Sequence, residues 1–226
     1  MNCDYRTCRQ GGWDDCWLLS ALVALGYHRP GDLGAMVHPV GDGSFAIALP
    51  GRSSVLVRPE SGGGTASEGD WAAAIEAAVQ HYTSAATTRL LAFGQGISLL
   101  TGNGRTGYTN VSGAGFAPLT RFRRRREWFE NRIAVAAGNS RVAMLGGSDG
   151  YWTDVKVDGL MNRHCYALLE FEPDSRTCRL RDPRGLDDDI PAGRKRDDYG
   201  PGEFWLTPDE VEGSFCGLSI EDNEDD

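Results

Sequence analysis

The stretch Gln10-Gly-Gly-Trp-Asp-Asp-Cys-Trp-Leu-Leu19 decides how this chain is interpreted, because it joins a glycine-rich turn directly to an apolar run. The run from Trp17 to Leu25 is apolar on all sides, as expected of a buried helix. Cys16 stands at its predicted N-terminus, where unpaired backbone N–H groups and the helix dipole favour a thiolate. The side-chain amide of Gln10, across the turn, can donate to an oxyanion forming beside Cys16. The stretch therefore predicts a cysteine nucleophile with its own oxyanion donor.

A second pattern, in the last third of the chain, predicts a partner for this cysteine. Residues Cys165 to Phe171 and Thr177 to Arg181 have strand character and flank a strong turn signal centred on Asp174. In such a hairpin His164 lies nearly opposite Asp182, with an offset of about one residue per strand, roughly 3 Å. An acid opposite a histidine can fix the tautomer of the ring and stabilise its imidazolium form.

We predict catalytic roles for four residues. Cys16 attacks a carbonyl carbon as the thiolate, and His164 holds the proton and delivers it to the leaving amine. Asp182 orients His164. Gln10 and the backbone N–H of Cys16 stabilise the oxyanion, and losing one such donor costs about 3 kcal/mol in barrier. Structural roles compete with these: a cysteine on an apolar helix is usually a core residue, and an aspartate before Pro183 can simply form a turn.

Composition narrows the class of protein. The chain has 226 residues, enough for one large domain or two subdomains, and is 40% hydrophobic. Its net charge of −9 argues against a nucleic-acid partner. The longest apolar run is too short to cross a membrane and follows acidic residues, so we expect neither a membrane partner nor a signal peptide.

Cysteine usage points to a reducing compartment. The six cysteines lack metal-type spacing, so we predict no metal ligands; they are Cys3, Cys8, Cys16, Cys165, Cys178 and Cys216. Three disulfides are an alternative, but a nucleophilic thiol fits a cytoplasmic, intracellular setting better, and we favour free thiols.

The halves of the chain differ in character. The first half contains a predicted helix from Trp71 to Val79 and a predicted hairpin of Phe45 to Leu49 with Ser54 to Val57. The second half has mostly strand patterns and ends in an acidic tail, Glu221 to Asp226, that we expect to fray. Between them, the basic segment Arg121 to Arg126 is either a solvated connector or helix start before Trp128 to Ala136, or a binding site for a phosphate backbone or an acidic partner.

Several of these segments resemble, in order, the protease core of the calpain family. The stretch around Cys16 is similar to the family's nucleophile segment, with Asp14 where the family usually has Gly. Arg163-His-Cys-Tyr166 resembles Gly-His-Ala-Tyr, which carries the catalytic His, and Leu180-Arg-Asp-Pro-Arg-Gly185 resembles Ile-Arg-Asn-Pro-Trp-Gly, which carries the orienting Asn. Gly202-Glu-Phe-Trp-Leu206 is similar to the family's Gly-Glu-Phe-Trp-Met.

Two shorter matches lie between these segments. Trp71 followed by Ile75, Glu76 and Ala78 resembles the family's Trp-x-x-x-Leu-Glu-x-Ala helix, and Thr101-Gly102 resembles part of Thr-Gly-Gly. The matches together span nearly the whole chain, and their shared order makes coincidence a poor explanation.

The resemblance implies an α+β, papain-like cysteine protease fold. A helical subdomain, residues 1–118, carries Cys16, and a β-rich subdomain, residues 119–226, carries His164 and Asp182, with the active site in the cleft between them. The implied function is that of a cysteine-type endopeptidase acting on a protein or peptide substrate. The sequence requires no cofactor; calcium is implied by the resemblance alone, and the chain contains no EF-hand signature. A calpain-like protein of this small size is consistent with a domain of a larger protein, or with a product processed from one. Secretion of the protein as an effector is a further alternative.

Three departures from the family matter. Asp182 replaces the usual Asn, and its negative charge would hold an imidazolium more firmly than a neutral amide does. Arg184 stands where the family has the Trp that shields this hydrogen bond, so we expect a wetter and weaker bond. Cys165 adds a second thiol beside His164. The alternatives are a transglutaminase-type or amidase-type acyl transferase, and a non-catalytic binding module with a calpain fold.

Overall fold

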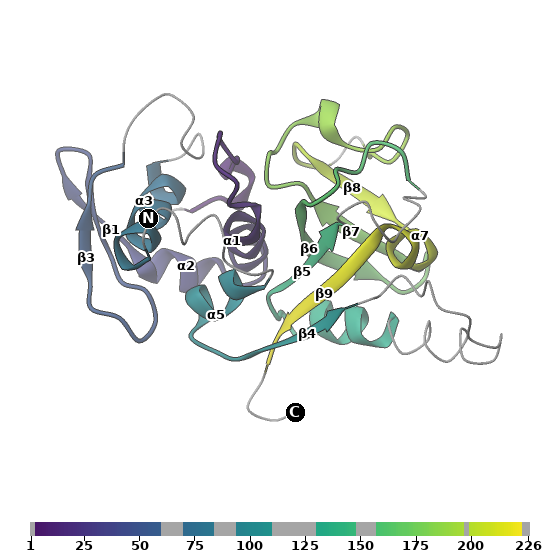
Figure 1. The fold of residues 1–226 in the computed structure, drawn as a ribbon, viewed down its shortest axis with the longest axis horizontal. Helices are drawn as coiled ribbons and strands as arrows, with labels where there is room; N and C mark the ends of the chain where they lie inside the picture. Colours follow the sequence, from purple (N-terminus) through teal and green to yellow (C-terminus); the bar gives the residue numbers. More distant parts are fainter. Residues whose placement is uncertain are drawn as a thin grey trace.

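The chain has an α+β fold with two antiparallel sheets. A computed structural model describes residues 3–59, 70–83, 94–109, 130–147, 157–196 and 199–222. The arginine cluster at 121–126 lies outside these ranges. The smaller sheet and most of the helices lie on one side of the molecule, and the larger sheet lies on the other (Figure 1).

The first half of the chain contains helices and a small sheet, and the small sheet packs against α3. The elements are η1 (Tyr5–Thr7), α1 (Cys16–His28), α2 (Pro30–Met36), β1 (Val37–Gly41), β2 (Ser44–Ile47), β3 (Val55–Val57), α3 (Asp70–Tyr82) and α5 (Gln95–Thr101). The predicted hairpin forms, with Phe45 opposite Val57. A third strand, β1, which the sequence patterns did not indicate, pairs with β2 on its other side.

The second sheet has six strands in the order β4-β9-β5-β6-β7-β8. They are β4 (Arg105–Thr109), β5 (Ala143–Gly147), β6 (Cys165–Glu172), β7 (Thr177–Arg181), β8 (Glu203–Leu206) and β9 (Phe215–Glu221). Helix α7 (Pro208–Ser214), the short η2 (Asp187–Asp189) and a helix over residues 130–138 complete this half. Residues 105–109, which the expected division places in the first subdomain, form a strand of this second sheet.

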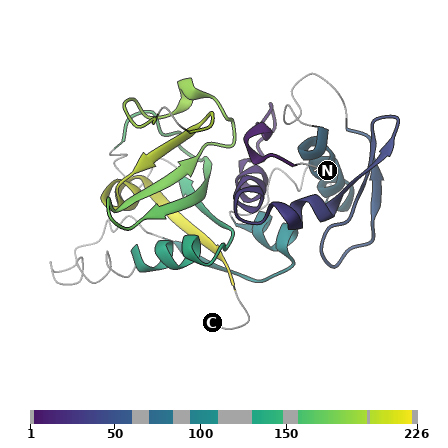
Figure 2. The same ribbon diagram turned by 180° about the vertical axis from the view of Figure 1, so that it is seen from behind.

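The larger sheet has an apolar core on each face. Along β6, the side chains of Cys165, Ala167 and Leu169 belong to the cluster that contains α1, whereas those of Tyr166 and Leu168 belong to the cluster around β8 and α7. This alternation follows from the two-residue period of a strand. Helix α1 therefore lies between the first-half elements and the sheet (Figure 2), and every residue from 17 to 26 is buried.

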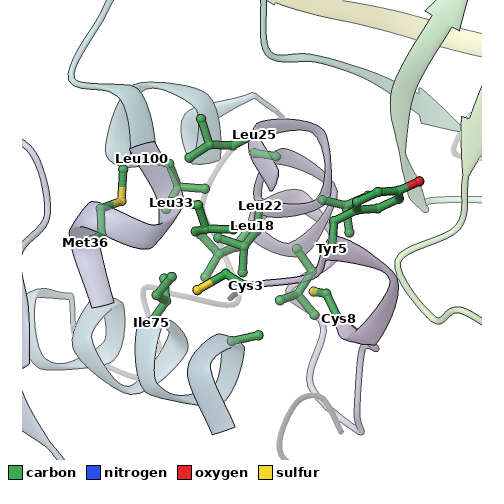
Figure 3. Close-up of a cluster of buried hydrophobic side chains, with 14 of the residues drawn as sticks. Cys3, Tyr5, Cys8, Leu18, Leu22, Leu25, Leu33, Met36, Ile75 and Leu100 are labelled. Carbon is green, nitrogen blue, oxygen red and sulfur yellow. The ribbon is translucent and has the colours of Figure 1, made fainter. Parts of the chain in front are cut away.

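The segment before α1 ties the two halves together. Figure 3 shows Cys3 and Cys8 within the cluster around α1, with the Tyr5 hydroxyl pointing away from it. That hydroxyl donates to Glu203 Oε1 on β8 at 3.1 Å. The fully buried Arg181 guanidinium on β7 donates to the carbonyl oxygen of Cys8 at 2.8 Å. These contacts fix the approach to α1, and hence the position of Cys16, relative to β7 and β8.

None of the helices in the described ranges has the length and apolar character needed to cross a bilayer.

Candidate active site

Cys16 is the first residue of α1. The carbonyl of Asp15, the N-cap residue, accepts from the backbone N–H groups of Leu18 and Leu19 at 2.8 and 3.1 Å. The side chain of Cys16 is half-buried and packs against the cluster around α1. The thiol therefore lies at the positive end of a buried helix, as the sequence predicts.

The hairpin of β6 and β7 brings His164 and Asp182 together. Ala167 lies opposite Arg181 and Leu168 opposite Leu180, which is the register expected from a turn at Asp174, and a bulge shifts the pairs nearer the turn by one residue. His164 Nε2 lies 2.9 Å from Asp182 Oδ1. His164 is 5% exposed and Asp182 is fully buried. The predicted contact is therefore present and is shielded from water.

The backbone and the ring of His164 are held by their neighbours. Arg163 adopts a left-handed conformation with φ of 56°, at the position where the resembling segment has Gly. The His164 ring meets the Tyr166 ring edge-on, with centroids 5.0 Å apart. The Tyr166 hydroxyl accepts from the backbone N–H of Met161 at 2.8 Å, which ties the preceding loop to the same ring.

Asp182 is held by backbone contacts as well as by the histidine. Its Oδ1 accepts a second hydrogen bond from the backbone N–H of Arg184 at 2.8 Å, and its own N–H donates to the Gly202 carbonyl at 3.0 Å. The expectation that Arg184 leaves this bond wet is wrong, because both partners are buried. The Arg184 guanidinium instead donates to Met161 Sδ at 2.8 Å.

Cys16 and His164 shift each other's pKa toward the charged forms. A hydrogen bond from the Cys165 thiol, together with the hydrogen bond and charge of His164, outweighs burial and lowers the pKa of Cys16 to about 5. Burial opposes protonation of His164, but its contacts with Asp182 and Cys16 raise its pKa to about 9. Because Nε2 of His164 faces Asp182, Nδ1 is the ring nitrogen left for the sulfur. Between these two pKa values the site holds a thiolate beside an imidazolium.

A pair of buried acids lies next to Cys16. Asp15 and Glu76, on α3, are 2% and 5% exposed and share a hydrogen bond. Burial and the neighbouring Asp15 raise the pKa of Glu76 to about 11, so Glu76 stays protonated and its O–H donates a hydrogen bond to Asp15. The sequence predicts a helix that contains Glu76 but indicates no role for this residue. Its signal was an acid on the buried face of an otherwise apolar, alanine-rich helix.

Gln10 is anchored close to the Asp182 loop. Its backbone N–H donates to the Pro183 carbonyl at 2.7 Å, and its side-chain Nε2 donates to the Trp13 carbonyl at 2.6 Å. An amide nitrogen carries two hydrogens, so one donor is left after the contact with Trp13. The segment of Gln10 thus meets the turn that carries Asp182, and its role as an oxyanion donor stays a prediction.

The other described cysteines differ sharply from Cys16. Cys3, Cys8, Cys165 and Cys178 are buried free thiols, and Cys16 is also free. Burial raises the pKa of both Cys8 and Cys178 to about 12. Within the described residues, no group of three or more His, Cys, Asp or Glu side chains is arranged to hold a metal ion.

No protein-family model matches the sequence, and a search among curated proteins finds no match. Any assignment of function therefore rests on the motifs and on the geometry of the site.

Proposed function

We propose that this protein is a calpain-like cysteine endopeptidase with a papain-like fold, in which Cys16, His164 and Asp182 hydrolyse peptide bonds. The observation that carries the proposal is the chain of contacts from a low-pKa thiol at a helix N-terminus, through a buried imidazole, to a buried aspartate. Nucleophile, base and orienting group in mutual contact are the signature of nucleophilic acyl transfer.

Attack begins from the ion pair. The Cys16 thiolate adds to the carbonyl carbon of the peptide bond, and the carbonyl oxygen becomes an oxyanion. Gln10 and the Cys16 backbone N–H are the proposed donors to that oxyanion. His164 then gives its Nδ1 proton to the leaving amine, the C–N bond breaks, and a thioester joins the substrate to Cys16.

Hydrolysis of the thioester restores the enzyme. Neutral His164 takes a proton from water, whose oxygen adds to the thioester carbonyl. Loss of the Cys16 sulfur releases the carboxylic acid, leaving thiolate and imidazolium as before. Asp182, held by two backbone hydrogen bonds, keeps Nε2–H of His164 engaged, so that Nδ1 stays directed at the sulfur throughout.

The rival functions differ in what they need from this site. A transglutaminase-type or amidase-type enzyme would use the same three residues but pass the acyl group to an amine or act on a side-chain amide. A binding module needs no reactive thiol, so the low pKa of Cys16 and the buried His164–Asp182 contact favour an enzyme.

Proteolysis and thiol reactivity are measured together. The purified protein is incubated with unfolded casein and, separately, with an epoxysuccinyl inhibitor, each with calcium and with a chelator. We expect casein cleavage and stoichiometric labelling of Cys16, both lost in Cys16→Ala. The matched control is Cys178→Ala, because Cys178 is a buried, free thiol on β7 with a pKa of about 12 and should not contribute to either readout.

The other outcomes sort the alternatives. If Cys16 is labelled without cleavage of casein, and an amine is incorporated into casein or casein is deamidated, the protein is an acyl transferase and not a protease. If neither labelling nor cleavage occurs, either with calcium or with chelator, the non-catalytic binding module is the function that remains. Cleavage that survives in Cys16→Ala would remove Cys16 from the mechanism.

A further inference from the structure

Cys165 is a buried thiol that takes no covalent part in the proposed hydrolysis, although it helps to lower the pKa of Cys16. It is the first residue of β6, directly after His164, and is 8% exposed. Its side chain lies on the face of β6 that packs against α1, together with Ala167 and Leu169. The strand therefore directs this thiol toward the helix whose first residue is Cys16.

The two cysteines are in direct contact. Cys165 belongs to the apolar cluster against which the Cys16 side chain packs, and α1 contacts β6 directly; in keeping with this, hydrogen bonding by Cys165 lowers the pKa of Cys16. The two sulfurs are thus neighbours, one on α1 and the other on β6, and both are free thiols. Cys3 and Cys8 belong to the cluster around α1, and Cys178 belongs to the cluster around β8 and α7.

We propose that Cys165 is a resolving cysteine, which closes a reversible disulfide with Cys16 when a hydroperoxide oxidises the site. The disulfide would block the nucleophile of the proposed endopeptidase, and in this respect the inference rests on that function. Its chemical basis is narrower: a reactive thiolate with a second sulfur already against it.

The reaction balances with the hydroperoxide as the only oxidant. The Cys16 thiolate attacks one oxygen of hydrogen peroxide, an S–O bond forms, the O–O bond breaks, and the departing hydroxide takes a proton to become water. The Cys165 sulfur then attacks the sulfenic sulfur of Cys16, the S–S bond forms and the S–O bond breaks. The hydroxyl group leaves with the Cys165 proton as a second water. The two sulfurs together lose two electrons, and a dithiol returns them by thiol–disulfide exchange.

The consequence is protection against irreversible damage. A sulfenic acid left alone is oxidised further to sulfinic acid, which a dithiol does not reduce. A neighbouring thiol removes the sulfenic acid before that second oxidation. A protein that carries both cysteines should therefore recover after oxidation, whereas one that lacks Cys165 should not.

The test follows the sulfur atoms by mass, without any activity assay. Reduced, desalted protein is treated with a small excess of hydrogen peroxide at pH 7, free thiols are trapped with N-ethylmaleimide, and intact and peptide masses are recorded. We expect the wild type to lose two hydrogens per molecule, with a linked peptide that joins Cys16 to Cys165, and to return to the reduced mass with dithiothreitol. Cys165→Ala and Cys165→Ser should instead gain two oxygens on Cys16 irreversibly, and Cys178→Ala should behave like the wild type.

Two results would overturn the proposal: a wild type that gains two oxygens on Cys16 as readily as Cys165→Ala, or a disulfide that joins a different pair. Mapping the wild type decides this even where a Cys165 variant folds poorly. The outcome is also separable from the proposed function. If the protein forms the Cys16–Cys165 disulfide but does not cleave casein, the redox proposal is supported and the protease proposal is contradicted. If it cleaves casein but does not form this disulfide, the protease proposal is supported and the redox proposal is contradicted.

Discussion

Two buried acid sites lie near Cys16, and they differ in the group that faces the carboxyl group. On β7, Asp182 faces the His164 ring at 2.9 Å and accepts a second hydrogen bond from a backbone N–H. On α3, Glu76 faces another acid, Asp15, and keeps its proton, because its pKa is raised to about 11. Similar burial thus yields two different chemical groups, one that pairs with a base and one that donates a hydrogen bond as a neutral acid.

The difference suits the charge of the nucleophile. The pKa of Asp15 is raised, mainly by burial. The hydrogen bond with Glu76 lowers this pKa, and the negative charge of Cys16 raises it further. A second full negative charge on Glu76 would add to this repulsion beside the thiolate. A shared proton avoids that charge, so we expect the α3 side to be structural, whereas the β7 side belongs to the proposed catalytic site.

Removing the base should produce the largest effect. In His164→Ala the thiolate loses its imidazolium partner, so the pKa of Cys16 should rise and turnover should fall by about 10²–10⁴-fold. Alkylation of Cys16 at pH 6, followed by mass, measures the first change, and casein cleavage measures the second. The matched control is His81→Ala, since His81 is exposed in the last turn of α3 and touches only Tyr82 among the described ring contacts. Unchanged turnover in His164→Ala would remove the imidazole from the mechanism.

The β7 side of the site was within reach of sequence reasoning because its geometry is local. A hairpin with a clear turn at Asp174 fixes which residues of β6 and β7 lie opposite each other, and the observed register agrees near the open end. The α3 side was not within reach. Glu76 meets Asp15 through packing of one helix on another, and no spacing in the sequence encodes that contact.

A second substitution, at Asp182, changes the acid opposite the histidine. In Asp182→Asn the amide oxygen can still accept from Nε2, but the negative charge is lost. The pKa of His164, about 9 in the wild type, should therefore fall, and the high-pH limb of the activity profile should move down with it. The low-pH limb, set by Cys16 near pH 5, should move up, because a weaker imidazolium stabilises the thiolate less.

A full pH profile of casein cleavage, with thermal unfolding as a check on folding, tests this. We expect a narrower pH range of activity, because the low-pH limb moves to higher pH and the high-pH limb moves to lower pH. A profile that keeps its high-pH limb at about 9 would mean that the charge of Asp182 does not support His164 in the way the geometry indicates.

Long-range pairings explain the other differences between expectation and structure. The acidic tail was expected to fray from Glu221, yet Glu221 is buried and accepts from Arg29 at 2.9 Å, where α1 ends. Strand β4 joins the second sheet by pairing with β9, more than a hundred residues away in sequence. Strand β1 contains Pro39 and is exposed after its first residue, so its sequence lacks the alternation that marks a strand. Each depends on partners that a local pattern does not reveal.

The third prediction concerns the α3 side and should appear in stability rather than in activity. Folding raises the pKa of Glu76 from 4.5 to about 11, so the folded protein holds a proton that the unfolded chain releases. Stability should then fall as pH rises between these values, by up to about 1.4 kcal/mol per pH unit. Glu76→Gln keeps a donor for Asp15 and removes this titration, so its unfolding free energy should depend less on pH.

Urea unfolding at pH 6 and pH 8 compares the two proteins. Glu76→Gln should gain on the wild type as pH rises, whereas Glu76→Ala, which leaves Asp15 without its donor, should be destabilised at both pH values by about 1–3 kcal/mol. Parallel pH dependences in the wild type and in Glu76→Gln would show that Glu76 is charged in the folded protein, and the contrast between the two acid sites would disappear.

The smallest effect is expected from Arg184, although it replaces the Trp of the resembling segment. Its contact with Asp182 runs through the backbone N–H, which Arg184→Ala retains, and its guanidinium donates to Met161 Sδ rather than to the histidine–aspartate pair. Casein cleavage by Arg184→Ala should stay within about twofold of the wild type, and the unfolding free energy within about 0.5 kcal/mol. A tenfold loss with an unchanged fold would mean that the guanidinium itself acts on the histidine–aspartate pair or on substrate. The β7 side would then depend on a side chain as well as on backbone, while the α3 side would be unaffected.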